Sequence, residues 1–153
     1  MGAAEELEAL HAAGRLKPTP ADPATASRLL AQAEANLRTV TEILRGTERP
    51  NPGAAAMLLW DGSAFRLLAA ALQLAGYRVT GALGHHRTAL DAVRLISGRG
   101  GLLIRLDALR RLRDQTMYDA GEPDPAEIEK GVADVEELAA WVRDAVSRAT
   151  KSQ

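Results

Sequence analysis

The stretch AAAMLLWDGSAFRLLAAALQLAG, residues 54–76, is apolar around almost its whole circumference when it is drawn as a helix. Small residues cluster at 54–56, 62–64 and 69–71, where they allow neighbouring helices to approach closely. A helix that is apolar on every side is normally buried on several of them. The stretch therefore predicts a helix over about 52–75 that other helices surround.

Two further segments carry a one-sided apolar stripe. Their apolar residues recur at alternating intervals of four and three, which places them on a single helix face. One-sided stripes of this kind are typical of helices that pack nearly antiparallel in a bundle. The stripes are formed by Ala26, Leu30, Ala33, Leu37, Val40 and Leu44 in the first segment and by Ile128, Val132, Val135, Ala139, Val142 and Val146 in the second.

Capping residues mark where helices begin. Asp124 is a predicted N-cap that Pro125 follows at the first helical position, with Glu127 as its capping-box partner. Asn51 and Pro52 predict a second helix start in the same way. Together with the periodicity, these signals predict helices over about 4–13, 22–46, 52–75, 84–97, 101–120 and 125–149.

These elements predict an all-α fold, an antiparallel up-and-down bundle of four to five long helices with a short N-terminal helix. Residues 1–21 are expected to form the N-terminal helix and a Pro-rich linker, and residues 22–150 the bundle. The stretch GYRVTG, residues 76–81, has strand-type composition but is short and bounded by glycines. It is therefore interpreted as a connector.

Composition limits the classes of function. The 153 residues fit one core, and the absence of cysteine excludes disulfides and thiolate metal sites. The net charge of −1 provides no general attraction to nucleic acid. The N-terminal residues lack the basic-then-apolar order of a signal peptide, and no apolar run is expected to cross a membrane. These features favour a cytoplasmic protein without membrane contact.

No metal or other cofactor is expected. Glu8 and His11 have the Glu-x-x-His spacing of di-iron bundles, but such a site needs two of these motifs and two more glutamates. His85 and His86 are expected to begin a helix, where free backbone N–H groups favour anions. They are candidate phosphate-binding residues, and the alternative is a polar helix start whose rings pack on a neighbour.

Two charged residues fall where apolar side chains are expected. Asp61 lies in the apolar stretch, so its carboxylate needs either a partner or a position at the rim. With about 100° of rotation per residue, Arg113 falls in the centre of a stripe that Leu102, Leu106, Leu109 and Met117 form. Arg113 is therefore predicted to face inward, either in a salt bridge with Asp61 or Asp114, or at an anion site or dimer contact.

The segment RRLRDQTMYD, residues 110–119, resembles the motif of HEPN domains (higher eukaryotes and prokaryotes nucleotide-binding). That motif is Arg, four to six residues, then His, often with a polar residue directly after the Arg. WDGSAFRLL at 60–68 and LGHH at 83–86 are similar to two further stretches of bacterial HEPN-like proteins. The order and spacing of the three segments agree over about 20–150.

The resemblance implies a helical bundle that forms a homodimer, with the motif arginines of two subunits in a shared cleft. Many HEPN proteins are metal-independent ribonucleases of toxin–antitoxin or defence systems. Others are paired with a small nucleotidyltransferase encoded beside them, and some are non-catalytic. The resemblance thus implies RNA, a nucleotide or a nucleotidyltransferase as partner, and assigns Arg113 to phosphate binding, with Asp114 as its polar neighbour. Arg110, His85, His86 and Asp61 are further candidates for binding substrate or phosphate.

Tyr118 occupies the position of the motif histidine. An unperturbed tyrosine titrates near pH 10, so it is a poor base at neutral pH but can donate a hydrogen bond. On a straight helix Arg113 and Tyr118 also point about 140° apart. The sequence leaves three hypotheses: a ribonuclease or its degenerate relative using Arg113, Asp114 and Tyr118, a non-catalytic dimer that binds a nucleotidyltransferase or nucleotide, and a helical module without a ligand.

Overall fold

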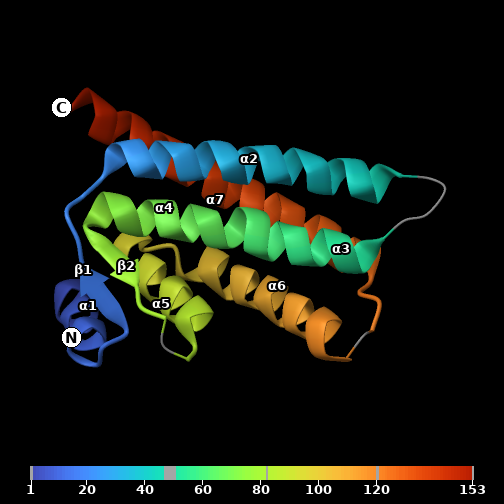
Figure 1. Ribbon diagram of the computed structural model, residues 1–153, viewed down its shortest axis with the longest axis horizontal. Helices are drawn as coiled ribbons and strands as arrows, with labels where there is room; N and C mark the ends of the chain where they lie inside the picture. Colours follow the sequence, from blue (N-terminus) through green and yellow to red (C-terminus); the bar gives the residue numbers. More distant parts are fainter. Residues whose placement is uncertain (1, 47–50, 82, 120, 153) are drawn as a thin grey trace.

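Long helices of opposite direction form the bundle in the computed structural model, which describes residues 2–46, 51–81, 83–119 and 121–152. In Figure 1, α2 lies beside the continuous run of α3, η1 and α4, with α7 behind them and with α5 and α6 along the other side. The predicted all-α bundle is confirmed. The elements are α1 (Ala3–Ala12), α2 (Pro23–Arg45), α3 (Pro52–Met57), η1 (Leu58–Ala64), α4 (Phe65–Ala75), α5 (His85–Ser97), α6 (Gly100–Asp119) and α7 (Pro125–Lys151).

The run α3–η1–α4 is the centre of the core, as its all-round apolar sequence predicts. Leu59, Trp60, Leu67 and Leu68 have no exposed surface. The expectation that no apolar run could cross a membrane is wrong. The 24 residues Pro52–Ala75 are long enough and apolar enough for a membrane span. Most of this run is buried inside the bundle, as the core helix of a soluble protein would be.

The predicted N-cap side chains are confirmed, but the predicted capping box is not, because in the described residues the Glu127 carboxylate accepts from Lys130. The Asn51 side chain accepts a hydrogen bond from the Ala54 amide, and the Asp124 side chain accepts one from the Ala126 amide. Asp22 caps α2 in the same way, since it accepts bonds from the amide and the hydroxyl of Thr25. These bonds satisfy amide groups that have no partner inside the helix.

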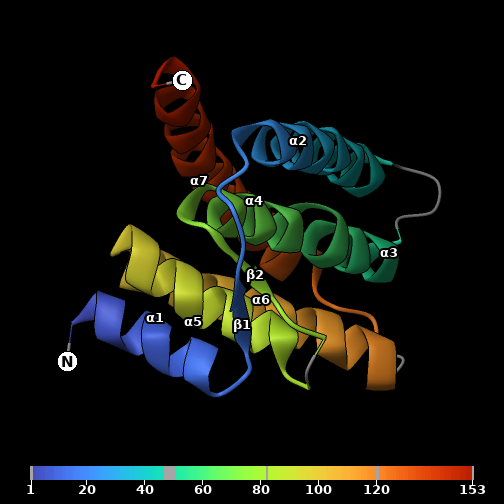
Figure 2. The same ribbon diagram turned by 60° about the vertical axis from the view of Figure 1, so that its left-hand side comes forward.

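Residues 76–81 are not only a connector. β2 (Tyr77–Val79) pairs antiparallel with β1 (Leu16–Pro18), which lies in the segment predicted to be a linker. Gly76 makes the turn possible because its φ of +84° favours glycine. Leu16 is buried, and α1 lies against α5 in Figure 2. Strand pairing and helix packing thus attach residues 2–21 to the bundle.

A π-helical turn, which the sequence did not predict, interrupts the central run at η1. Its contacts with α2 are polar: Asn36 Nδ2 donates to the Gly62 carbonyl at 2.8 Å, and Ser63 Oγ donates to the Ala33 carbonyl at 3.0 Å. Gly62 suits the close approach of α2, since a Cβ there would lie 2.7 Å from Leu58 Cδ1 and 3.0 Å from Asn36 Nδ2, and these side chains would have to shift. π-Helical turns within α-helices frequently lie at functional sites, and this one carries Asp61.

Candidate functional site

Arg113 of α6 and Asp61 of η1 form a two-point ion pair. The Arg113 Nε and one terminal nitrogen each donate to a different oxygen of Asp61, and both distances are 3.1 Å. The Arg113 side chain is 13% exposed and that of Asp61 is 40% exposed, so the pair lies at the edge of the core. The predicted inward direction of Arg113 and its salt bridge with Asp61 are confirmed.

The remaining terminal nitrogen of Arg113 is also occupied. It donates to Asp114 Oδ1 at 3.1 Å, and Asp114 Oδ2 accepts from Arg110 at 3.0 Å. Burial acts to lower the pKa of Arg113, but its hydrogen bonds to the carboxylates of Asp61 and Asp114, together with their negative charges, outweigh burial and raise the pKa. Each of the three guanidinium nitrogens of Arg113 therefore donates to a carboxylate of the protein itself.

The ion pairs continue from Arg110 toward α5. Asp107 accepts from Arg110 Nε at 2.8 Å, and its second oxygen lies 3.0 Å from Arg111 and 3.6 Å from Arg87. Arg87 also pairs with Asp91 within α5. Counted from Asp61 to Asp91, this chain of ion pairs contains as many aspartates as arginines. The cluster around Arg113 thus has no excess positive charge with which to attract an anion.

His86, at the start of α5, bonds to the buried Trp60 of η1. The Trp60 indole N–H donates to His86 Nδ1 at 3.0 Å, so a neutral His86 ring carries its hydrogen on Nε2. Burial lowers the pKa of His86, and the charges of His85 and Arg113 lower it further, while Asp61 and Asp114 act in the opposite direction. A neutral His86 is therefore a hydrogen-bond donor through Nε2, and it lies close enough to the Arg113 cluster for those charges to affect its pKa.

His85 belongs to the same group of rings. Its ring centroid lies 4.3 Å from that of His86 and 5.7 Å from that of Phe65, both at edge-to-face angles. Phe65 in turn lies 4.6 Å from His86. The candidate histidines are thus packed on neighbouring rings, which was the alternative to phosphate binding in the sequence analysis. His86 is also close enough to Arg113 and Asp61 to interact with their charges.

Tyr118 does not join the cluster. Its residue surface is 76% exposed, and in the described part of the chain it makes no hydrogen bond, ion pair or ring contact. Met117 was expected on the buried stripe, and this expectation is wrong, because the residue is 45% exposed. The structure therefore brings together Arg113, Asp114, Asp61, Arg110 and His86, and leaves Tyr118 in solvent.

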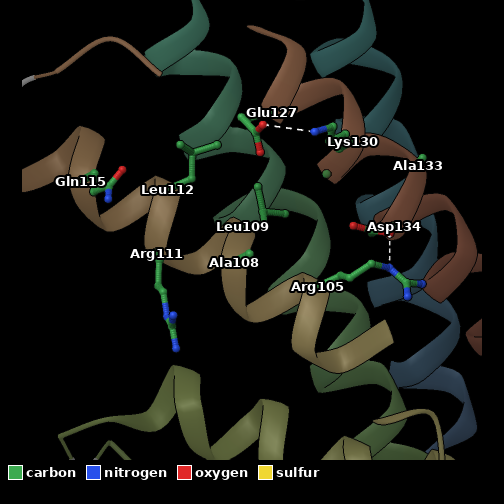
Figure 3. Close-up of a pocket in the computed structure, with 11 residues that line it drawn as sticks. Arg105, Ala108, Leu109, Arg111, Leu112, Gln115, Glu127, Lys130, Ala133 and Asp134 are labelled. Atoms are coloured by element: carbon green, nitrogen blue, oxygen red, sulfur yellow. Dashed lines mark hydrogen bonds and ion pairs between the residues drawn. The ribbon is translucent and has the colours of Figure 1, made fainter. Parts of the chain in front are cut away.

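A groove between α6 and α7 begins beside Arg111, at the edge of this chain of ion pairs. It has a volume of about 490 Å³, and Leu109, Leu112 and Gly131 are among the residues that line it. Figure 3 shows its charged rim already paired, with Lys130 bonded to Glu127 and Arg105 to Asp134. In the described residues no group of three metal-ligating side chains gathers at this groove or elsewhere.

Sequence reasoning missed several members of the site, among them Trp60, Phe65, Asp107 and Arg87. Trp60 directly precedes Asp61 in η1, and the indole bonds to His86 while the Asp61 carboxylate bonds to Arg113. Asp107 and Arg87 join through the packing of α5 on α6, which depends on helix register. Their only local signal is the i, i+3 and i, i+4 spacing of Asp107 to Arg110 and Arg111.

Comparison of the chain with protein-family models, with characterised proteins and with solved structures found no match. The chemistry of the site therefore rests on its own geometry. The site combines an arginine whose three nitrogens all donate to carboxylates, a neutral histidine that can donate from Nε2, and a cluster of aromatic rings.

Proposed function

We propose that this chain is a HEPN-like protein of a toxin–antitoxin or defence-type system whose ribonuclease-type motif is degenerate. In this proposal the protein acts in the cytoplasm as a homodimer by binding, and its partner is a nucleotidyltransferase or a nucleotide. The observation that carries the proposal is the engagement of Arg113 by Asp61 and Asp114.

A phosphate group at Arg113 would have to displace carboxylates that are already bonded. Two-point arginine–carboxylate bonds have the same geometry as arginine–phosphate bonds, so the carboxylates compete directly with a phosphate for the same nitrogens. Asp61 and Asp114 would also repel a phosphate electrostatically. Arg113 is therefore better placed to hold α6 on η1 than to bind the scissile phosphate of an RNA.

The proposed degenerate motif also lacks an available base. Tyr118 is exposed and separated from Arg113. The Nδ1 lone pair of His86 accepts from Trp60, and its Nε2 carries a hydrogen, so neither nitrogen is free to take a proton from a ribose hydroxyl. What His86 offers is a donor, which supports recognition of a ligand acceptor and does not support acid–base catalysis.

The test is a metal-free RNA cleavage assay with the purified protein, run beside co-expression with a nucleotidyltransferase if the native genome encodes one beside this gene. We expect no cleavage, a dimer in light scattering, and co-purification of the two proteins. The matched variants are Arg113→Met and Arg111→Met, which remove a largely buried and a mostly exposed ion-paired arginine from the same helix. Metal-independent cleavage that Arg113→Met abolishes and Arg111→Met retains would refute the non-catalytic proposal.

A second candidate is an active metal-independent endoribonuclease in which His86 replaces the missing motif histidine. The observation in its favour is that His86 lies within the electrostatic influence of Arg113, Asp61 and Asp114. It requires His86 to give up its bond to Trp60 when RNA binds. This candidate predicts that the natural chain cleaves RNA, that His86→Gln abolishes the cleavage and that Tyr118→Phe leaves it unchanged. The first proposal predicts no cleavage by the natural chain or by either variant.

A further inference from the structure

The N-terminal residues form an arm that runs from α5 to α2. In Figure 2, α1 lies along α5, and the chain then passes through β1 before it reaches α2. We call residues 2–19 the N-terminal arm. No residue of α1 is buried, and Leu16 is the buried residue of β1. One buried side chain, the pairing of β1 with β2 and a small set of hydrogen bonds are therefore the main attachments of the arm.

Arg15 joins the N-terminal arm to the buried side of α5. Its Nε donates at 2.9 Å to the hydroxyl of Thr88, which is buried. The same hydroxyl donates at 3.3 Å to the carbonyl of Gly84, the residue before α5. A buried hydroxyl is satisfied when it both donates and accepts, and Arg15 is the donor to this one. The arm thus completes the hydrogen bonding of the first turn of α5.

The first turn of α5 depends on contacts with distant parts of the chain. Gly84 occupies the N-cap position with a φ of +81°, and no side chain caps the helix there. A side-chain cap would satisfy one of the free amides, so a turn without one relies more on tertiary contacts. Two such contacts are the bond from Arg15 to Thr88 and the bond from the Trp60 indole to His86. The arm and η1 therefore hold the same helical turn.

We propose that the N-terminal arm regulates His86. While Arg15 is bonded to Thr88, the first turn of α5 is held where His86 accepts from Trp60, and release of the arm loosens this turn and frees Nδ1 of His86. Thr88 and His86 belong to one helical turn, so they move together. A free Nδ1 can take a proton from a ligand beside Arg113, which a bonded Nδ1 cannot. Arg15 is thus a positioning residue, and the inference does not depend on the partner or activity proposed above.

The weak attachment of the arm suits it to release. Segments with few buried contacts open at a lower free energy than the core of the same protein. β1 and β2 are three residues long, and their register places Lys17 opposite Arg78, where like charges weaken the pairing. The arm is therefore expected to open while the bundle stays folded, and the bond from Arg15 to Thr88 opposes that opening.

The test is native-state hydrogen exchange followed by NMR, in which the indole N–H of Trp60 reports the bond to His86. The decisive variants are Arg15→Met and Thr88→Val, of which the second removes the hydroxyl without changing a charge. The matched controls are Thr88→Ser, which keeps the hydroxyl, and Asp124→Ala, which removes the N-cap bond of α7. Loss of that cap lowers the overall stability by an amount similar to the loss of one hydrogen bond.

We expect Arg15→Met and Thr88→Val to speed exchange of the Trp60 indole N–H and of the arm amides about tenfold, the size of the loss of one buried hydrogen bond. Thr88→Ser should leave both rates close to those of the natural chain. Asp124→Ala should leave the indole rate unchanged, because release of the arm does not require unfolding of the bundle. Lys17→Glu should slow indole exchange about twofold, since it creates an opposite-charge pair across the sheet.

Three results would overturn the proposal. One is an unchanged indole rate in Arg15→Met and Thr88→Val, whether or not the arm amides exchange faster, because the arm would then have no effect on His86. Another is an indole rate that Asp124→Ala raises as much as these variants do, which would assign the exchange to global unfolding. The third is an unchanged indole rate in Lys17→Glu, a variant that does not weaken the fold. RNA cleavage and co-purification test the proposed function separately.

Discussion

Arg113 and the cross-strand pair of Lys17 and Arg78 hold cations in opposite circumstances. Arg113 is largely buried, and all three of its nitrogens donate to carboxylates. Lys17 and Arg78 are exposed, face each other, and have no carboxylate partner in the described residues. The arginine that the sequence motif marks for anion binding is therefore the less available one. The comparison shows that a motif identifies a charged side chain, whereas its surroundings decide whether that charge can bind a ligand.

Arg113→Met should cause the largest loss of stability. It leaves Asp61 and Asp114 without their shared partner at the edge of the core, and because Asp61 is partly exposed the loss should be about 2 kcal/mol, below the value for a fully buried pair. Urea unfolding followed by circular dichroism measures it. Arg111→Met, at an exposed position of the same helix, should lose less than about 0.5 kcal/mol. Equal losses in the two variants would remove the distinction between paired and exposed cations.

The bond between Trp60 and His86 predicts a stability that depends on pH. The pKa of His86 is lowered in the folded state from its ordinary 6.5, so the unfolded chain binds more protons in this range. The stabilising contribution is present above pH 6.5 and is lost as the pH falls through the folded pKa, because a protonated His86 cannot accept from Trp60.

His86→Gln tests this prediction, since a glutamine oxygen can accept the same bond without titrating. The stability of the natural chain should fall more steeply between pH 7 and pH 5 than that of the variant, with tryptophan fluorescence reporting the change near Trp60. Parallel pH profiles for the two proteins would mean that other groups cause the dependence.

Lys17→Glu should stabilise the fold by about 0.5 kcal/mol, the size of a favourable cross-strand pair. The reason is that Arg78 would gain an opposite charge where it now faces a like charge. Thermal and urea unfolding of the single variant measure the gain. A loss of stability would show that the ammonium of Lys17 has a favourable partner, and the contrast with Arg113 would disappear.

Tyr118→Phe should have the smallest effect, within about 0.5 kcal/mol of zero. The Tyr118 side chain is exposed and its hydroxyl has no hydrogen-bond partner in the described residues. The same unfolding measurement applies. A loss well above this value would place Tyr118 in an interface, such as that of the proposed dimer.

Most of the fold could be predicted because its signals are local. The caps Asn51 and Asp124 and the all-round apolar run at 52–75 fix where helices begin and which of them is central. The strands were missed because β2 has its partner at Leu16–Pro18, far away in the chain and next to prolines. The π-helical turn was missed because it is accompanied by hydrogen bonds to α2, a helix distant in the sequence. No local spacing of residues reveals such bonds.

The candidate site could be predicted in part for the same reason. Helical phase directed Arg113 inward, and the cost of a buried carboxylate implied a partner for Asp61, so the ion pair followed from the sequence. The tautomer of His86 and the role of Trp60 did not follow, because they depend on the packing of α5 against η1. The family resemblance added a proposal for function and named Tyr118, which the structure leaves apart from the cluster.

The central claim is that the Arg113 guanidinium is committed to Asp61, and a double-mutant cycle with Arg113→Met and Asp61→Asn tests it most directly. The paired geometry predicts that the two changes together cost less than their sum, with a coupling free energy of about 1 to 2 kcal/mol. Unfolding in urea of the four proteins provides the cycle. A coupling near zero would mean that Arg113 is free in solution to bind another anion, and it would contradict the account.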